Sequence, residues 1–164
     1  GQFPGAEIEG LLGVDNADVR DGINLATRFL YSLVDSGKVR LAFRDDYKLH
    51  LAYHTACHME KMGWAIYSIS ALRLIPGVKL TVLDSQCCGI AGTYGFKKEN
   101  YPTSQAIGDS LFKKIEALVP DYVVTDCETC KWQIEMSTSV PVKHPISIIA
   151  DALDVEKTIE LNRR

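Results

Sequence analysis

Three short segments of the chain have the residue pattern of β-strands. Residues 48–54 alternate apolar and polar side chains, which places the apolar ones on one side of an extended chain. Residues 79–83 and 122–125 are shorter apolar segments of the same kind. We therefore predict three strands, each followed by a segment that can carry functional side chains.

Apolar residues at spacings of three and four predict helices around these strands. Gly37 ends the first helix, Pro76 and Gly77 follow the second, and Pro120 stops the third. The helical patterns cover residues 18–35, 59–72 and 107–118, a segment that begins near residue 132, and a last helix over 146–153.

The alternation of strands and helices predicts an α/β fold. We expect a parallel sheet of three to four strands with helices on both faces, in a Rossmann-like βαβ order. In such sheets ligands bind beyond the carboxyl ends of the strands, where the segments that leave the strands face one crevice.

Composition and charge narrow the possible partners. The chain has 164 residues, of which 46% are hydrophobic, and its net charge is −3. It has no basic cluster, so we expect no nucleic-acid partner. The longest apolar stretches, such as residues 64–72, are about half of the roughly 20 residues that span a bilayer.

The domain organisation is expected to be simple. We predict one cysteine-rich domain over residues 1–164, with residues 1–46 as an N-terminal helical lead-in. The chain starts at Gly1 without a secretory signal pattern, so we expect a domain excised from a longer subunit.

Five cysteines are the most informative residues in the sequence. Their spacing is C-x29-C-C-x38-C-x2-C, and each group follows one of the three predicted strands. We expect the thiols to converge in the strand-exit loops at one edge of the sheet. The five candidates are Cys57, Cys87, Cys88, Cys127 and Cys130.

Thiolates at such an edge can bind zinc or an iron–sulfur cluster. Zinc takes four ligands, and two adjacent cysteines fit two metals of a larger cluster better than one ion, so five thiols favour a multinuclear centre. Buried unreactive thiols or disulfides are the alternative. Cys127 and Cys130 alone have a spacing that zinc ribbons, ferredoxins and thiol oxidoreductases share.

Several neighbouring residues have both a functional and a structural interpretation. Gly89 and Gly92 are candidate cofactor-binding residues that let the backbone approach a cluster, or they serve only in turns. His54 and His58 flank Cys57 as ligands, proton carriers or ordinary hydrogen-bonded histidines, and we select neither as a site residue. Asp126 accepts hydrogen bonds across the loops or caps a turn.

The cysteine pattern, with Gly89 after the adjacent pair, resembles the cysteine-rich CCG domain found in the B subunit of heterodisulfide reductase and in iron–sulfur subunits of glycolate and lactate oxidation. The resemblance covers residues 48–150. More narrowly, the chain is similar to the C-terminal part of the C subunits of anaerobic glycerol-3-phosphate dehydrogenases. The segments that carry this similarity are YHTACH at 53–58, DSQCCGIAGTYG at 84–95 and VPVKHPISIIADAL at 140–153.

The resemblance implies a [4Fe–4S] cluster, noncubane as in heterodisulfide reductase, with the five cysteines as its ligands. It implies flavoprotein dehydrogenase subunits as partners and electron flow towards the quinone pool. The location that it implies is cytoplasmic and peripheral on the cytoplasmic membrane face. The chain matches only the last cysteine-rich repeat of those subunits and has no ferredoxin cysteines.

The function that we predict is non-catalytic electron transfer in an oxidoreductase complex, because the sequence has no flavin or nicotinamide motif and no candidate catalytic residue. The alternative is a zinc-stabilised module that docks other subunits and has no redox role. A third possibility is a thiol enzyme that uses Cys127 and Cys130 for disulfide exchange.

Overall fold

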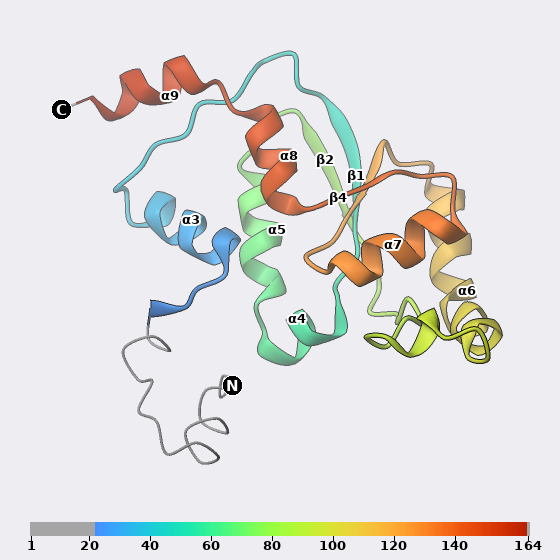
Figure 1. Ribbon diagram of the computed structural model, residues 1–164. Helices are drawn as coiled ribbons and strands as arrows, with labels where there is room; N and C mark the ends of the chain where they lie inside the picture. The colour runs from blue at the N-terminus through green and yellow to red at the C-terminus, as the bar shows by residue number, and fades with distance from the viewer. Residues whose placement is uncertain (1–21, 164) are drawn as a thin grey trace, which may run out of the picture.

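A computed structural model describes residues 22–163, and in it a parallel sheet lies between two groups of helices (Figure 1). The strands are β1 (Leu49–Tyr53), β2 (Val78–Val82), β3 (Tyr122–Val124) and β4 (Val142–Lys143). The helices are α3 (Ala26–Asp35), α4 (Cys57–Met62), α5 (Ala65–Arg73), the 3-10 turn η1 (Tyr94–Phe96), α6 (Tyr101–Leu118), α7 (Glu128–Ser137), α8 (Pro145–Ala152) and α9 (Val155–Asn162).

The sheet confirms the predicted α/β class. Its strand order is β2-β1-β3-β4, and every pair is parallel. Leu51 is paired with Leu80 on one side and with Tyr122 on the other, which makes β1 a central strand. The three predicted strands are present within one or two residues of their expected bounds, and β4 completes the sheet.

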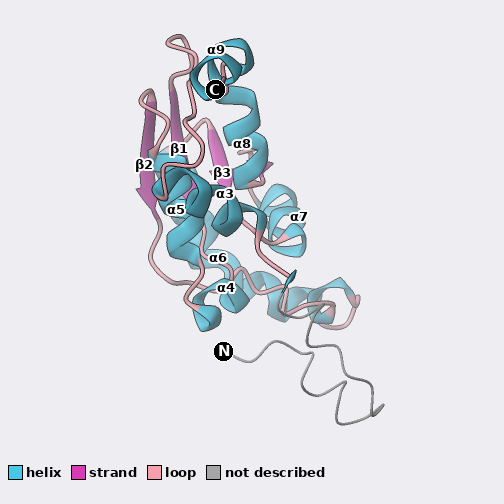
Figure 2. Ribbon diagram, turned by 90° about the vertical axis from the view of Figure 1, so that its left-hand side faces the viewer, coloured by secondary structure: helices cyan, strands magenta, loops and turns pink. Residues whose placement is uncertain are grey.

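Helices cover both faces of the sheet, as predicted. Alternate residues of β1 point to opposite faces, because successive side chains of a strand alternate. Ala52 packs in a core cluster with residues of α6 and α7, whereas Leu51 and Tyr53 pack with residues of α5 and α8. Figure 2 looks at the molecule from the side of α3 and α5, with the strands behind them.

The predicted helix over residues 59–72 is in fact two helices. Gly63 has a φ of +67° and ends α4, after which α5 starts at Ala65. Glycine adopts this left-handed conformation without strain, so the chain turns there and the apolar stripe is interrupted. As a result Met59 is buried, but Ile66 is 54% exposed.

The two ends of the described chain also differ from the prediction. Residues 18–21 of the first predicted helix lie outside the described residues; α3 begins only at Ala26, and Ile23 before it is exposed. At the other end, α8 is followed by α9, a helix that we did not predict because it has no buried apolar stripe. Asp154 caps α9 by accepting a hydrogen bond from the Lys157 N–H.

Between residues 22 and 163 no helix combines the length and the apolar character needed to cross a bilayer.

Candidate metal centre

The five cysteines follow the carboxyl ends of three neighbouring strands. Cys57 is the first residue of α4, just after β1, and Cys87 and Cys88 lie in the segment after β2. Cys127 is the N-cap of α7, and Cys130 lies in its first turn, after β3. The expected placement of every cysteine in a loop is therefore wrong for Cys57 and Cys130, which lie in helical first turns.

Sulfur atoms from different strand exits lie close together. Cys57 Sγ is 3.9 Å from Cys87 Sγ, and Cys88 Sγ is 3.3 Å from Cys130 Sγ. All five cysteines are free thiols. Two thiolates bound to one tetrahedral metal ion are about 3.8 Å apart, whereas bonded sulfurs are about 2.05 Å apart. The spacing of these sulfurs fits metal ligation better than disulfide formation.

Cys130 hydrogen-bonds with two other cysteines and changes the pKa values of all three. These hydrogen bonds lower the pKa values of Cys88 and Cys127 to about 5, with a further contribution from His54 at Cys88 and against the opposing effect of burial. The pKa of Cys130 is raised by its hydrogen bonds with Cys127 and Cys88 and by burial. Lowered pKa values favour metal binding, because a thiol must lose its proton to become a ligand.

Cys57 differs from Cys88 and Cys127 in that its thiol is exposed and its pKa is raised. Partial desolvation and the neighbouring Cys87 raise the pKa of Cys57. Charge interactions with both Cys87 and Cys88 connect it to the buried cysteines. The five thiols thus form a continuous group from the surface at Cys57 to the interior at Cys130.

Gly89 shapes the loop after the adjacent cysteines. Its N–H donates a hydrogen bond to Cys87 Sγ at 3.3 Å, and its φ is +89°. A Cβ atom at this position would overlap the carbonyl oxygen of Ser104 in α6. Gly92 also has a positive φ, but a Cβ atom added there would meet no described atom within 4 Å. Of the two glycines, Gly89 is the one that contacts a cysteine.

A buried carboxylate supports the segment that carries Cys127. Tyr53 donates a hydrogen bond to Asp126 Oδ2 at 2.6 Å, and Ser68 donates one to Oδ1 at 2.7 Å. The Asp126 side chain is 1% exposed, and His144 Nε2 lies 3.9 Å away. Asp126 therefore accepts hydrogen bonds from β1 and α5, the first of the two roles that its sequence position suggested.

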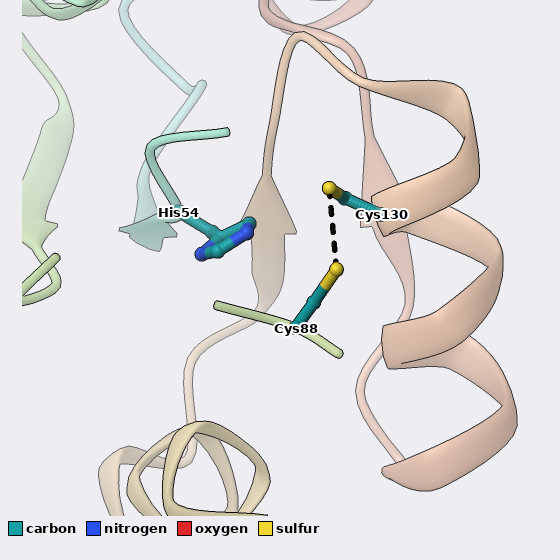
Figure 3. Close-up of side chains that lie close together, drawn as sticks. All are labelled: His54, Cys88 and Cys130. Atoms are coloured by element: carbon teal, nitrogen blue, oxygen red, sulfur yellow. Dashed lines mark hydrogen bonds between the residues drawn. The ribbon is translucent and has the colours of Figure 1, made fainter. Parts of the chain in front are cut away.

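His54 is a site residue that we did not select from the sequence. One of its ring nitrogens, Cys88 Sγ and Cys130 Sγ all lie within 4.8 Å of one another, and all three residues are buried (Figure 3). Neither ring nitrogen forms a well-aligned hydrogen bond with residues 22–163, but the ring lies close enough to Cys88 to help lower the pKa of that thiol. The signal in the sequence was its place directly after the strand that leads to Cys57.

The donor set fits an iron–sulfur cluster. Five cysteine sulfurs, two with lowered pKa values, and backbone N–H groups of Gly89 and Ile90 that donate to sulfur are features that stabilise an anionic thiolate-ligated centre. The buried imidazole of His54 adds a further donor beside Cys88 and Cys130.

The chain is similar to several known proteins. Residues 51–135, which include all five cysteines, match the model of the CCG cysteine-rich domain. The chain is 63% identical over 147 residues to the C subunit of anaerobic glycerol-3-phosphate dehydrogenase from Escherichia coli (strain K12), an alignment that covers 90% of this chain and 37% of that protein. The chain thus spans little more than a third of this relative.

Two further similarities are to oxidoreductases with other substrates in their names. The chain is 33% identical over 122 residues to the glycolate oxidase iron-sulfur subunit of E. coli (strain K12), covering 71% of this chain and 28% of that protein. It is 31% identical over 78 residues to D-2-hydroxyglutarate dehydrogenase of Haemophilus influenzae, covering 47% of this chain and 8% of that protein.

Proposed function

The chain belongs to the family of cysteine-rich CCG domains, and from this premise we propose that it is the iron–sulfur electron-transfer domain of an anaerobic glycerol-3-phosphate dehydrogenase-type complex. The observation that carries the proposal is the meeting of sulfurs from three strand exits at one edge of the sheet. A relative that is named as an iron-sulfur subunit supports the same cofactor.

The proposed ligands are Cys57, Cys87, Cys88, Cys127 and Cys130, and the proposed centre is a noncubane [4Fe–4S] cluster. When bound, such a cluster supplies reversible one-electron transfer at a potential set by its type, charge, hydrogen bonds and exposure. Adjacent Cys87 and Cys88 suit neighbouring metals of one cluster, because Cys87 Sγ lies beside Cys57 Sγ and Cys88 Sγ lies beside Cys130 Sγ.

The protein contributes charge and hydrogen bonds to this site. The low pKa values of Cys88 and Cys127 keep two thiols ionised at neutral pH, so that both are ready to ligate. The Gly89 N–H donates to Cys87 Sγ and offsets negative charge on that sulfur. Gly92, in the same glycine-containing loop, is proposed to allow close approach of the backbone to the cofactor.

Two exposed aromatic side chains, one on η1 and one on α7, offer a contact surface for a partner protein. Phe96 and Trp132 are 46% and 45% exposed, and their ring centroids are 6.0 Å apart. Trp132 lies on α7, the helix that also carries Cys130, and apolar surface of this kind is typical of protein contacts. We infer that a flavoprotein dehydrogenase subunit docks here and that electrons continue towards quinone, with the complex peripheral on the cytoplasmic membrane face.

The test of this function is the composition and spectrum of the protein purified without oxygen. Bound iron and acid-labile sulfide, with an electron paramagnetic resonance signal that a flavoprotein partner reduces, are the expected results. Serine substitution at each cysteine in turn is expected to change the signal. A fully occupied native preparation that contains zinc alone would refute the proposal.

The alternative function is a zinc-stabilised docking module without redox activity. Its supporting observation is the buried group of His54, Cys88 and Cys130, a mixed nitrogen and sulfur donor set of the kind that zinc binds. A structural zinc site needs four ligands, so zinc retention would then tolerate loss of at least one of the five cysteines. A cluster that uses all five would be altered by every one of the five substitutions.

A further inference from the structure

His54 is a buried histidine that lies beside two of the five cysteines, Cys88 and Cys130. It is 1% exposed and follows the last residue of β1. Its backbone N–H donates to the Val124 carbonyl at 2.9 Å, which fixes the residue against β3. Its two ring nitrogens form no well-aligned hydrogen bond within the described chain, although buried polar atoms of proteins are almost always paired, and the group on which the ring acts is the Cys88 thiol.

Other histidines of the chain do not share this state. The ring of His50 forms a hydrogen bond with Thr81 Oγ1 at 3.0 Å, and His144 Nδ1 accepts one from the Ile146 N–H. His58 is exposed to solvent. A buried imidazole that is held in place beside two cysteine sulfurs, with no well-aligned hydrogen bond to either ring nitrogen, is an arrangement that suits a metal ligand.

The surroundings of the ring supply the other donors. A ring nitrogen lies within 4.8 Å of both Cys88 Sγ and Cys130 Sγ, and these sulfurs are 3.3 Å apart. In Figure 3 an edge of the imidazole faces the two sulfurs, which approach from a loop and from α7. Donor atoms on one tetrahedral metal ion are about 3.6–3.8 Å apart, so ligation of one ion by all three needs only small movements of these side chains.

We propose that His54 is a nitrogen ligand of the metal centre, beside Cys88 and Cys130. This inference rests on the proposed function only in that a metal or cluster occupies the cysteine site. A neutral imidazole brings no negative charge, so ligation by His54 adds a donor to the five cysteines and leaves the charge of the centre unchanged. A thiolate at the same position would add one negative charge and lower the reduction potential.

The experiment is pulsed electron paramagnetic resonance on the reduced protein, purified without oxygen. Two samples are compared, one produced with natural histidine and one with 15N-labelled histidine. A strong hyperfine coupling that changes with the isotope is expected, because a coordinated nitrogen shares spin density with the iron. This measurement needs no variant, so it does not depend on whether a substituted protein folds. A cluster signal with no histidine nitrogen coupling overturns the inference and leaves the electron-transfer proposal standing.

Three variants assign the nitrogen to a residue. His54→Ala is expected to abolish the coupling, and His58→Gln, the matched control on α4, is expected to keep it. His54→Cys is expected to retain iron, lose the coupling and shift the midpoint potential downward, since a thiolate replaces a neutral ligand. Coupling that persists in His54→Ala, or disappears in His58→Gln, contradicts the assignment.

A native preparation that holds only zinc refutes the cluster and still decides the role of His54. In that case Zn²⁺ is added to the metal-free protein and the ring nitrogens are observed by 1H–15N correlation spectroscopy. The expected result is a large shift of one His54 ring nitrogen with an unchanged His58 spectrum. An unshifted His54 spectrum on a protein that has bound zinc overturns the inference.

Discussion

Replacing Gly89 by alanine tests how closely the loop after the adjacent cysteines is packed. Gly89 has a φ of +89°, and a Cβ there would overlap the Ser104 carbonyl oxygen. Gly92 is the matched control, because it has a φ of +68° but no atom within 4 Å of the added Cβ. The two substitutions therefore share the backbone strain and differ in the steric overlap.

The magnitudes follow from these two contributions. A left-handed conformation costs an L-residue about 1–2 kcal/mol, which is the whole expected cost of Gly92→Ala. Steric overlap in a packed interior adds about 1–3 kcal/mol, so Gly89→Ala is expected to cost about 2–5 kcal/mol of the free energy of unfolding. At about 2–4 °C per kcal/mol for a chain of this size, the melting temperatures of the two variants should differ by several degrees.

Urea denaturation of the metal-free chain measures both costs, and iron content after anaerobic purification gives a second readout. Gly89→Ala should also lose iron, because its N–H moves away from Cys87 Sγ, which it contacts at 3.3 Å. Equal destabilisation by the two substitutions, or a larger effect at Gly92, would refute the claim that the Ser104 carbonyl leaves no room for a side chain at residue 89.

Further predictions concern the buried hydroxyl and the thiols. Tyr53→Phe removes a hydrogen bond to the buried Asp126 carboxylate and should lower the free energy of unfolding by about 1.5–3 kcal/mol. Tyr101→Phe, the control at an exposed position, should change it little. Equal effects of the two substitutions in urea denaturation would contradict this prediction. In the metal-free protein the iodoacetamide reaction of Cys127 should reach half its maximal rate near pH 5, while Cys57, whose pKa is raised, should react only in alkaline solution. Cys130→Ala removes the hydrogen bond that lowers the pKa of Cys127, so its alkylation profile should move to higher pH; an unmoved profile would mean that Cys130 is not the donor.

Alternation along the chain was sufficient to predict the sheet. The strand over 48–54 was predictable from its alternating residue types, although β1 is central and buried on both faces, where a continuous apolar run is the commoner pattern. The convergence of the cysteines at one edge followed from the strand order, since every strand in a parallel sheet ends on the same side.

The details of the site depend on contacts that no local pattern encodes. Gly63 was not recognised as a helix end, because a glycine within an apolar stripe is also tolerated inside a helix. The helix α9 has an exposed surface and is attached to the segment near Arg40 by Asn162, a contact across more than a hundred residues. His54 was not selected, because its burial and its closeness to two cysteine sulfurs appear only when β1, the Cys88 loop and α7 come together.

The measurement that tests the central claim most directly is the iron, zinc and acid-labile sulfide content per chain, with the electron paramagnetic resonance spectrum of the same sample. The protein should be purified without oxygen and compared with its Cys88→Ser and Cys130→Ser variants. We predict iron and sulfide bound together in the native chain, with a signal that both substitutions change or abolish. Zinc as the sole bound metal, or iron and sulfide that remain unaltered in both variants, would contradict a shared cluster at this edge of the sheet.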